Sequence, residues 1–530
     1  MVVQEQQSTW LRNFNPFLTT GGARWPSAAG IHEPLLIYNP MQGEYTPWLA
    51  EAWTWEEPSL QLVFTLRPEL LWSDGAPLTA ADVAFTFQML RDYPALDSGG
   101  VWRILASIEA ADARTVRVRF QRPFSPGLLE VAHTPIVPQH VWSKVEDPVT
   151  FTNPEPVASG PFVDVVRFES QVFELGRNVH HWMGVPQVER LRFPAMSSND
   201  QVTLALVQGD IDWAGAFVPA VKRTFVARNP DHHKAWFPMV GDTVFLYPNT
   251  TRAPLDKADV RRAISMAIDR EMLVQVAMYD YTVPAHPTGL SDGYTSWRLD
   301  PVPPDMNWVR HDPAASAALL DAAGFVLGPD GIRIDAQGER LSLEITTPAG
   351  WSDWVRAAQV ISRDLRAVGI DAKVQGRDFT AWFDAVTRGE FDLSLGWSVS
   401  GPTPYRMYRG LMASQGVEPV GTAAGANWHR YGSPRADGLL AAMEATTAPE
   451  EQKALALELQ SAFLAEVPAL PLFPSASWGE ANTRWVTGFP SPEDPYARLS
   501  PNTAPEPLLV LTHLVWRDSE SPMASRGGAP

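Results

Sequence analysis

The sequence predicts an α/β protein of two lobes, with a chain that passes between the lobes more than once. At 530 residues the chain is too long for one ordinary hydrophobic core, so two or more domains are expected. Strand patterns and helix patterns alternate along the chain, which is typical of the α/β class. The 48 prolines and 36 glycines are spread evenly, so no single linker divides the sequence. An interleaved arrangement of two lobes explains these observations best.

The first strongly patterned segment combines a strand, a turn and a helix. Apolar residues alternate in LQLVFTL (60–66) as they do in a strand, and SDG predicts a turn at 73–75. Thr79, with Asp82 three residues later, is typical of a helix start closed by a capping box. Apolar residues then recur at helical spacing as far as Leu90, so we expect a helix here.

The middle of the chain repeats this alternation. TVRVRF (115–120) predicts a strand, and QVTLALVQGDIDWAG (201–215) predicts a helix that runs into a short strand. The segment from 241 to 274 predicts strand, turn and helix in that order. The buried stripe of its helix is expected to contain Val260, Ile264 and Ile268.

The second half contains a βαβ pattern. LSLEIT (341–346) and IDAKVQ (370–375) alternate as strands on either side of a helix that Gly369 is placed to end. FDLSLGW (391–397) predicts one more strand, which carries Trp397 at its C-terminal end. One face of the intervening helix is expected to contain Trp354, Ala358, Ile361, Leu365 and Val368.

The C-terminal region predicts three further elements. A helix begins with Pro449 and runs to about Ala465. VPALPLFP (467–474) is expected to be extended chain that returns to the first lobe, and LLVLTHLVW (508–516) is expected to be a late strand. The polar tail at 517–530 is expected to be disordered.

Composition excludes several classes of function. The net charge of −18 argues against nucleic-acid binding, which requires clustered Lys and Arg. The absence of cysteine excludes disulfides, thiolate metal sites and Cys nucleophiles. No segment approaches the roughly 20 consecutive apolar residues that a membrane helix needs. The first residues, MVVQEQQSTW, lack the basic and apolar regions of a signal peptide. The 21 tryptophans suggest that several line a ligand surface, in addition to filling the core.

Motifs for catalysis, cofactors and metals are missing. The pairs His180–His181 and His232–His233 are adjacent residues, without the i, i+4 spacing of a helical metal pair. No GxSxG, P-loop or GxGxxG motif occurs. We therefore predict no catalytic residue, no metal site and no cofactor.

A series of motifs in one order resembles one family. They are LLWSDGAPLTAADVAFTF, preceded by IHEPLLIYNP with PWLAEAW, and followed by GRNVHHW, GDIDWAG, PLDKADVRRAISMAIDR and PALPLFP. Together they resemble the extracytoplasmic solute-binding proteins of ABC importers, in the peptide, nickel and oligosaccharide group called family 5 or cluster C. The resemblance covers the chain from about Asn13 to Trp516, and the oligosaccharide-binding members, such as cello-oligosaccharide receptors, look most similar.

The resemblance implies a type II periplasmic-binding-protein fold of cluster C, with an extra α/β subdomain and a ligand cleft between lobes that close by a hinge. Lobe I would comprise 1–45, 160–247 and 480–516, the extra subdomain 46–159, and lobe II 248–479. Most motif residues are expected to be structural. Asp74 and Gly75 would serve a turn, Asp210 a helix end, and Arg261 and Asp269 a helix surface.

The loop GWSVSGPTPYRMYRG (396–410) predicts the kind of ligand. Peptide-binding members look alike in having an Asp three residues after the Gly-Trp, where it pairs with the amino terminus of the ligand, but Ser400 stands there in this sequence. A cationic amine buried without a counter-ion would lose several kcal/mol of solvation. Trp397 and Tyr405 instead offer flat apolar faces, and Ser400 and Thr403 offer hydroxyls, as a sugar requires. Oligosaccharide-binding members look similar in having a GPTPY-type loop.

Other residues join the predicted site. Several of these candidates also have a structural interpretation. Asn13 and Asn15, which precede Pro16, are typical turn formers. Glu33 is suited to a salt bridge, and Trp428 is suited to a buried structural role. Trp236 and Asn249 flank the strand 241–249, which we expect to cross between lobes at the cleft floor. The predicted ligand-binding residues are Trp10, Asn13, Asn15, Glu33, Trp236, Asn249, Trp397, Ser400, Tyr405 and Trp428.

The sequence therefore predicts a monomeric periplasmic or cell-surface receptor, not an enzyme. It would bind a neutral oligosaccharide, such as β-linked gluco- or manno-oligosaccharides from cellobiose upward, and hand it to an ABC importer permease. One alternative is an oligopeptide receptor, which needs an acidic residue to hold the ligand amine. Glu33 is the only obvious substitute for the Asp that is missing at position 400. The other is a glycoside hydrolase, which needs two carboxylates about 5–5.5 Å or 6.5–9.5 Å apart. No such pair occurs in the loops assigned to the cleft.

Overall fold

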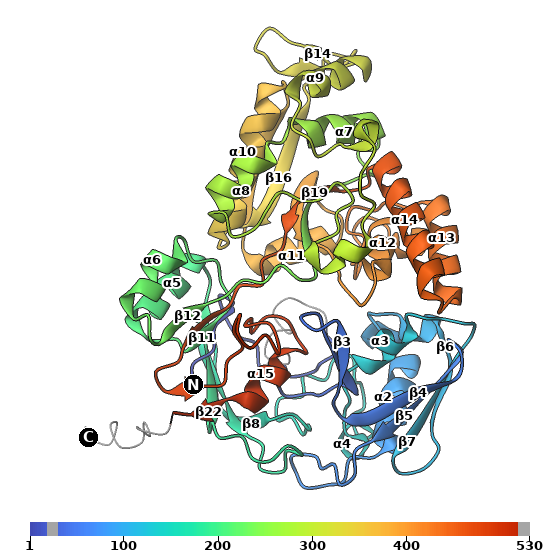
Figure 1. Ribbon diagram of the computed structural model, residues 1–530, viewed down its shortest axis with the longest axis vertical. Helices are drawn as coiled ribbons and strands as arrows, with labels where there is room; N and C mark the ends of the chain where they lie inside the picture. The colour runs from blue at the N-terminus through green and yellow to red at the C-terminus, as the bar shows by residue number, and fades with distance from the viewer. Residues whose placement is uncertain (19–29, 518–530) are drawn as a thin grey trace. The chain divides into compact units, whose positions relative to one another are not determined.

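The computed structural model describes residues 1–18 and 30–517, which form two compact units (Figure 1). The first unit contains Met1–Pro238 and the chain from Ser477 onward, and the second contains Met239–Ala476. The chain thus passes from one unit to the other twice, as the interleaved pattern predicts. The finer division into lobe I, a subdomain at 46–159 and lobe II stays a prediction. The predicted disorder of the tail falls on residues 518–530, which lie outside the described residues.

The first unit contains an antiparallel sheet of order β4–β5–β7–β6, against which a helix packs. The predicted capping box is confirmed, because Thr79 and Asp82 close the start of α2 reciprocally. The predicted turn is also present, since Gly75 adopts a positive φ of 85°. The elements are β4 (Ala50–Glu57), β5 (Gln61–Leu66), α2 (Ala80–Asp92), β6 (Leu105–Ala110), β7 (Thr115–Phe120), α3 (Gly127–Ala132) and α4 (Gln139–Trp142).

Two further sheets of the first unit have orders β1–β10–β9–β8 and β11–β20–β12. The second of these joins segments far apart in sequence, since β20 pairs antiparallel with both β11 and β12. The elements are β1 (Glu5–Gln6), β2 (Leu36–Asn39), β3 (Glu44–Pro47), β8 (Phe162–Glu169), β9 (Val172–Arg177), β10 (Arg190–Met196), α5 (Asn199–Gln208), β11 (Trp213–Ala214), α6 (Val221–Thr224), β12 (His233–Ala235), β20 (Glu480–Asn482) and β21 (Val486–Thr487).

The segment 508–516 corrects one prediction. It is not a single strand, because it forms most of helix α15 (Pro507–His513) and then a short strand, β22 (Val515–Trp516). Proline is favoured in the first turn of a helix, and the run from Leu508 to Leu511 is buried on all sides. In a short run that is buried all round, apolar and polar residues do not alternate, so the sequence pattern cannot separate a strand from a helix.

The second unit is built on a five-stranded sheet of order β17–β16–β18–β13–β19. The predicted βαβ unit is confirmed, since β16 runs parallel to β17 and α10 connects them (Figure 1). The predicted face of α10 is buried, and Gly369 follows the helix with φ of 90°. The strands are β13 (Thr243–Pro248), β16 (Ser342–Pro348), β17 (Asp371–Arg377), β18 (Leu393–Trp397) and β19 (Leu470–Pro474), beside the hairpin of β14 (Val326–Leu327) and β15 (Arg333–Ile334).

Helices surround this sheet. They are α7 (Ala258–Ala267), α8 (Arg270–Met278), α9 (Pro313–Ala322), α10 (Ser352–Ala367), α11 (Phe379–Thr387), α12 (Tyr405–Met412), α13 (Pro434–Ala445) and α14 (Pro449–Glu466). Arg261 on α7 corrects another prediction, because it is only 2% exposed and is not a helix-surface residue. Its guanidinium donates to the backbone carbonyls of Leu255 and Val467, so it joins α7 to the end of α14.

One edge of the five-stranded sheet lies beside both passages of the chain between units. The chain enters the second unit just before β13 and leaves it just after β19. Thr243 pairs with Pro474 at this edge, and Val244 pairs with Trp397. The C-terminal end of β18 therefore lies next to the two connecting segments. Within the residues that the structure describes, no helix has both the length and the apolar character needed to cross a membrane.

Candidate functional site

Seven aromatic rings gather around the C-terminal end of β18, and we call them the aromatic cluster. Trp397 is stacked on Phe383 with ring centroids 6.1 Å apart and an interplanar angle of 11°. Trp428 meets Trp397 edge-on at 5.3 Å, and Trp351 lies 6.1 Å from Trp397 at an angle of 34°. The cluster consists of Trp351, Trp354, Phe379, Trp382, Phe383, Trp397 and Trp428.

The order of the strands explains why these rings meet. β16 runs parallel to β17 and to β18, so the C-terminal ends of all three lie at one edge of the sheet. Trp351 follows β16, Phe379 follows β17, and Trp397 ends β18. Ligand sites in α/β sheets lie outside such carboxyl ends. The sequence prediction used this rule for Trp397 alone, and it missed Trp351, Phe379 and Phe383. Applied to the two strands before Trp397, the same rule would have found the first two.

The cluster has a buried base and a partly exposed surface. Trp382 is fully buried, and Trp354 and Trp428 are 5% and 6% exposed. Trp382 Nε1 donates to Ser394 Oγ at 3.1 Å, which fixes the buried indole against β18. The partly exposed members are Trp351, Phe379, Phe383 and Trp397. These four rings are therefore held on a rigid aromatic base.

Backbone contacts also fix Trp397. The Tyr247 hydroxyl donates to the Trp397 carbonyl at 3.1 Å, and burial raises the pKa of Tyr247, so this hydroxyl stays neutral. A Cβ at Gly396 would lie 2.8 Å from Tyr247 Cε2, which is closer than side chains approach. Glycine at 396 thus allows Tyr247 to pack directly beneath the strand that carries Trp397.

The loop that follows Trp397 is pinned at several points. The Ser398 hydroxyl accepts from Thr243 N at 3.0 Å, and the Tyr294 hydroxyl donates to the Gly401 carbonyl at 2.7 Å. Ser400 is half-buried and its carbonyl accepts from Arg406 Nη1 at 3.2 Å. Tyr405 is 1% exposed, and its hydroxyl donates to the buried carboxylate of Glu444. The loop is thus a fixed rim in which Trp397 and Ser400 keep accessible surface.

The predicted asparagines make backbone hydrogen bonds. Asn15 is fully buried, and its Nδ2 donates to the carbonyls of Pro148 and Phe151 at 3.1 and 2.8 Å. Asn13 Oδ1 accepts from Asn15 N at 3.0 Å, as in a turn. Asn249, in the other unit, is also fully buried, and its Nδ2 donates to the carbonyls of Gly389 and Phe391 at 2.8 and 3.0 Å.

The remaining predicted residues lie in the first unit. Glu33 is fully buried, and its Oε1 accepts from Trp48 Nε1, His181 Nε2 and Trp182 Nε1 at 2.7, 3.1 and 3.2 Å. Trp10 is 2% exposed and packs edge-on against Phe173, whereas Trp236 is half-buried. Trp397, Trp428, Ser400 and Tyr405 thus lie in one part of the second unit. The other predicted residues have no such common location, and ligand contact stays a prediction for all ten.

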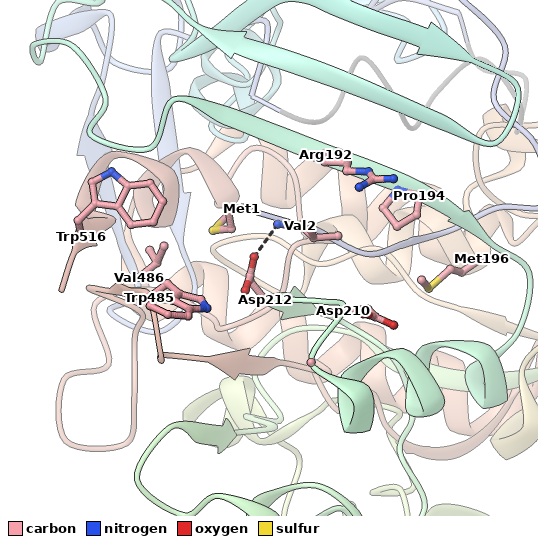
Figure 2. A pocket seen from close by; sticks show the side chains of 11 residues that line it. Met1, Val2, Arg192, Pro194, Met196, Asp210, Asp212, Trp485, Val486 and Trp516 are labelled. Atoms are coloured by element: carbon pink, nitrogen blue, oxygen red, sulfur yellow. Dashed lines mark hydrogen bonds between the residues drawn. The ribbon is translucent and has the colours of Figure 1, made fainter. Parts of the chain in front are cut away.

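The first unit also contains a cavity of about 430 Å³ beside the N-terminal strand (Figure 2). Val2 N donates to Asp212 Oδ2 at 2.8 Å across it. The cavity is lined by Met1, Val2, Arg192, Pro194, Met196, Gly209, Asp210, Asp212, Trp485, Val486 and Trp516. None of the predicted ligand-binding residues lines it. In the described parts of the chain, no group of three or more His, Asp or Glu side chains is arranged to hold a metal ion.

Comparison with known proteins identifies related chains. The family described as "Bacterial extracellular solute-binding proteins, family 5 Middle" matches residues 44–418. The nickel-binding periplasmic protein of Escherichia coli is 25% identical over 395 residues, with 72% of each chain covered. The glutathione-binding protein GsiB of Salmonella typhi is 25% identical over 457 residues, which cover 83% of this chain and 82% of that protein.

A solved structure resembles the whole chain. It is a periplasmic oligopeptide-binding protein of an oligopeptide ABC transporter from Thermotoga maritima, determined with bound mannohexaose. Its TM-score is 0.88 and its sequence is 27% identical, with 98% of each chain covered. The similarity therefore includes both units.

Proposed function

This chain belongs to the bacterial extracellular solute-binding proteins of family 5, and on that premise we propose that it binds a neutral oligosaccharide. It has the two-lobe type II periplasmic-binding-protein fold, and it is an extracytoplasmic solute-binding receptor of an ABC importer. The family includes receptors named for nickel and for glutathione, so membership does not choose the ligand. The choice depends on the site.

The observation that carries the proposal is the partly exposed indole of Trp397 on its aromatic base, beside a loop without a carboxylate. An indole face suits the C–H face of a pyranose ring, which is apolar, while the sugar hydroxyls turn toward polar groups. Ser400 offers a hydroxyl where peptide-binding relatives are expected to have an Asp. A peptide amine would therefore lack a counter-ion here, whereas a neutral sugar needs none.

The sugar-bound relative supports the same class of ligand. The Thermotoga maritima protein was determined with mannohexaose, although it is named as an oligopeptide-binding protein. Its similarity extends over 98% of this chain. We infer a ligand of β-linked glucose or mannose units, from the disaccharide upward.

The proposed mechanism needs no chemical step. Binding of the ligand would expel water from the aromatic faces. Each well-placed hydroxyl hydrogen bond would add about 0.5–1.5 kcal/mol. A monomeric receptor would then hand the sugar to the membrane permease subunits of the importer.

The predicted site residues divide by exposure. Trp397, Ser400 and Trp236 keep accessible surface, and we propose that they contact the ligand directly. The buried ones would contribute by packing and hydrogen bonding within their own unit. Those are Trp10, Asn13, Asn15, Glu33, Asn249, Tyr405 and Trp428.

Calorimetric titration tests the proposal. The ligands are cello-, manno-, xylo- and laminari-oligosaccharides, with a peptide library as the comparison. We expect saturable binding of at least one sugar series and no binding of peptides. If peptides bind and none of the sugars does, the proposed ligand class is wrong and the protein is a peptide receptor of the same family.

A second measurement separates the receptor from a glycoside hydrolase. The protein is incubated with the best-binding oligosaccharide, and the products are analysed by chromatography. We expect the oligosaccharide to be recovered intact. Shorter products would contradict the receptor and would require two carboxylates across the sugar bond.

A further inference from the structure

We propose that Phe379, in the second unit, is a stacking face that the ligand reaches only with its third sugar unit. The proposal rests on the proposed function, because it assumes an oligosaccharide bound on Trp397. It goes further by assigning a preference for longer chains over a disaccharide. The residues that carry it belong to one edge of one sheet, and all of them lie within the second unit.

Three aromatic rings follow one another along the carboxyl edge of this sheet, and we call them the aromatic row. Trp397 ends β18, Trp351 follows β16 and Phe379 follows β17, in the order in which these strands are neighbours. The ring centroids of Trp397 and Trp351 are 6.1 Å apart, and those of Trp351 and Phe379 are 5.6 Å apart. Each step along the aromatic row is therefore comparable to the length of one sugar unit in a chain.

The two ends of the aromatic row have nearly parallel planes. Phe383 is stacked with Trp397 at an interplanar angle of 11° and with Phe379 at 13°. The centroids in these pairs are 6.1 and 5.9 Å apart. Atoms in contact are only about 3.5–4.0 Å apart, so the stacked rings are displaced sideways. This offset leaves part of each ring uncovered, in agreement with the partial exposure of Trp397 and Phe379.

The start of helix α11 holds the Phe379 ring in place. Asp378 Oδ1 accepts from Thr380 N at 3.0 Å and so caps the helix, and Phe379 lies in its first turn. The ring packs against the fully buried Trp382 of the same helix, with centroids 5.8 Å apart. A ring that is already held loses little conformational entropy when a ligand stacks on it. The Asp378 carboxylate can accept hydrogen bonds from sugar hydroxyls, so it suits a neutral ligand.

The aromatic row predicts how affinity depends on chain length. Trp397 and Ser400 would bind the first sugar unit, and Trp351 would contact the second. A disaccharide placed in this way does not reach Phe379, whereas a trisaccharide does. The third unit buries apolar surface on the Phe379 ring, which adds to the affinity. We therefore expect the Kd to fall from the disaccharide to the trisaccharide.

The test is calorimetry with the disaccharide, trisaccharide and tetrasaccharide of the series that the wild-type protein binds most tightly. Phe379→Ala is expected to raise the Kd of the two longer ligands about tenfold and to leave the Kd of the disaccharide unchanged. Phe379→Tyr keeps a flat ring and should bind all three ligands as the wild type does. Phe379→Leu keeps apolar bulk without a ring face, so it should behave like the alanine variant even if Phe379→Ala fails to fold.

Trp308→Ala is the matched control. Trp308 is a partly exposed tryptophan of the same unit, and its Nε1 donates to the Leu464 carbonyl at 2.9 Å, shortly before β19 begins. β18 and β19 both run antiparallel to β13, so the start of β19 lies at the edge of the sheet opposite Trp397. The control should therefore leave the Kd of all three ligands unchanged.

The outcomes distinguish the two proposals. If Phe379→Leu changes no Kd, or raises the Kd of all three ligands by the same factor, the role of Phe379 at the third unit is refuted and the sugar receptor stands. A wild-type Kd that is equal for disaccharide and trisaccharide refutes it as well. An equal loss in Phe379→Tyr and Phe379→Leu would refute stacking. If the wild type binds no sugar at all, the proposed function fails and the role of Phe379 fails with it.

Discussion

Trp397 and Phe383 are stacked in parallel, 6.1 Å apart, on a base of buried indoles. Because Phe383 supports one face of Trp397, the indole plane is set before any ligand arrives. Preorganised aromatic faces reduce the ordering cost of binding. The pair therefore links the packing of α11 against β18 to the proposed recognition of sugar.

Trp397→Ala is expected to weaken oligosaccharide binding by more than about tenfold, because it removes the stacking face. Trp397 is half-buried, so the protein is expected to stay folded. Calorimetry gives the Kd, and thermal unfolding followed by circular dichroism checks the fold. Trp516→Ala, a half-buried tryptophan at the cavity of the first unit, serves as the control and should bind as the wild type does. An unchanged Kd in Trp397→Ala would remove Trp397 from the site.

Ser400→Asp introduces the carboxylate that peptide-binding relatives are expected to have. We expect weaker sugar binding, because the buried part of the loop would have to accommodate a charge. We also expect measurable binding of peptides with a free amino terminus, since the new carboxylate can pair with the amine. Ser400→Asn has nearly the same size without the charge and is the control. If both variants bind sugar equally, charge at position 400 does not select the ligand.

Asn249→Asp is expected to destabilise the second unit more than Asn249→Ala does. The alanine variant loses the two hydrogen bonds that Nδ2 donates to buried carbonyls and the two that Oδ1 accepts from Thr251, and each carbonyl left without a partner costs about 1–3 kcal/mol. The aspartate variant places a negative charge against the same two carbonyls. Thermal unfolding at neutral pH measures the difference, and acidification should narrow it as the new carboxyl is protonated. Equal stability of the two variants at neutral pH would contradict the hydrogen-bond donor role of Asn249 Nδ2.

Glu480 is expected to make stability depend on pH. Burial raises its pKa in the folded protein well above the ordinary 4.5, so the folded state binds this proton more tightly than the unfolded state. Its favourable contribution is thus complete below about pH 4.5 and is lost as the pH rises through the folded pKa. The loss is at most about 1.4 kcal/mol per pH unit.

Glu480→Gln, which is neutral at every pH, isolates this contribution. Relative to the wild type, the variant should gain stability as the pH rises from 4.5, as measured by denaturant unfolding at a series of pH values. A stability difference that does not change with pH would show that the Glu480 carboxyl titrates normally in the folded protein.

Local patterns predicted much of the fold, because the residues that decide these elements are neighbours in sequence. Thr79 and Asp82 form a capping box, and alternation in 391–397 places Trp397 at a strand end. The prediction of a strand at 508–516 was wrong because the local pattern is uninformative there. The run is buried on all sides, so its apolar residues show neither the strand period nor the helix period.

The candidate site depends on strand order, which the sequence does not contain. Trp351 meets both Phe379 and Trp397 because β16 lies between β17 and β18. The sequence also does not show which side chains of the loop are exposed. Tyr405 and Trp397 belong to one loop, but only the three-dimensional packing shows that Tyr405 is inside and bonded to Glu444. Arg261 was predicted to lie on a helix surface, but its guanidinium is buried and donates to the carbonyls of Leu255 and Val467.

The most direct test is a crystal structure of the protein with its tightest-binding oligosaccharide. We expect a pyranose ring stacked on the exposed face of the Trp397 indole, with sugar hydroxyls near Ser400 and no carboxylate facing the ring. A ligand bound elsewhere, with the Trp397 indole left in contact with solvent, would contradict it.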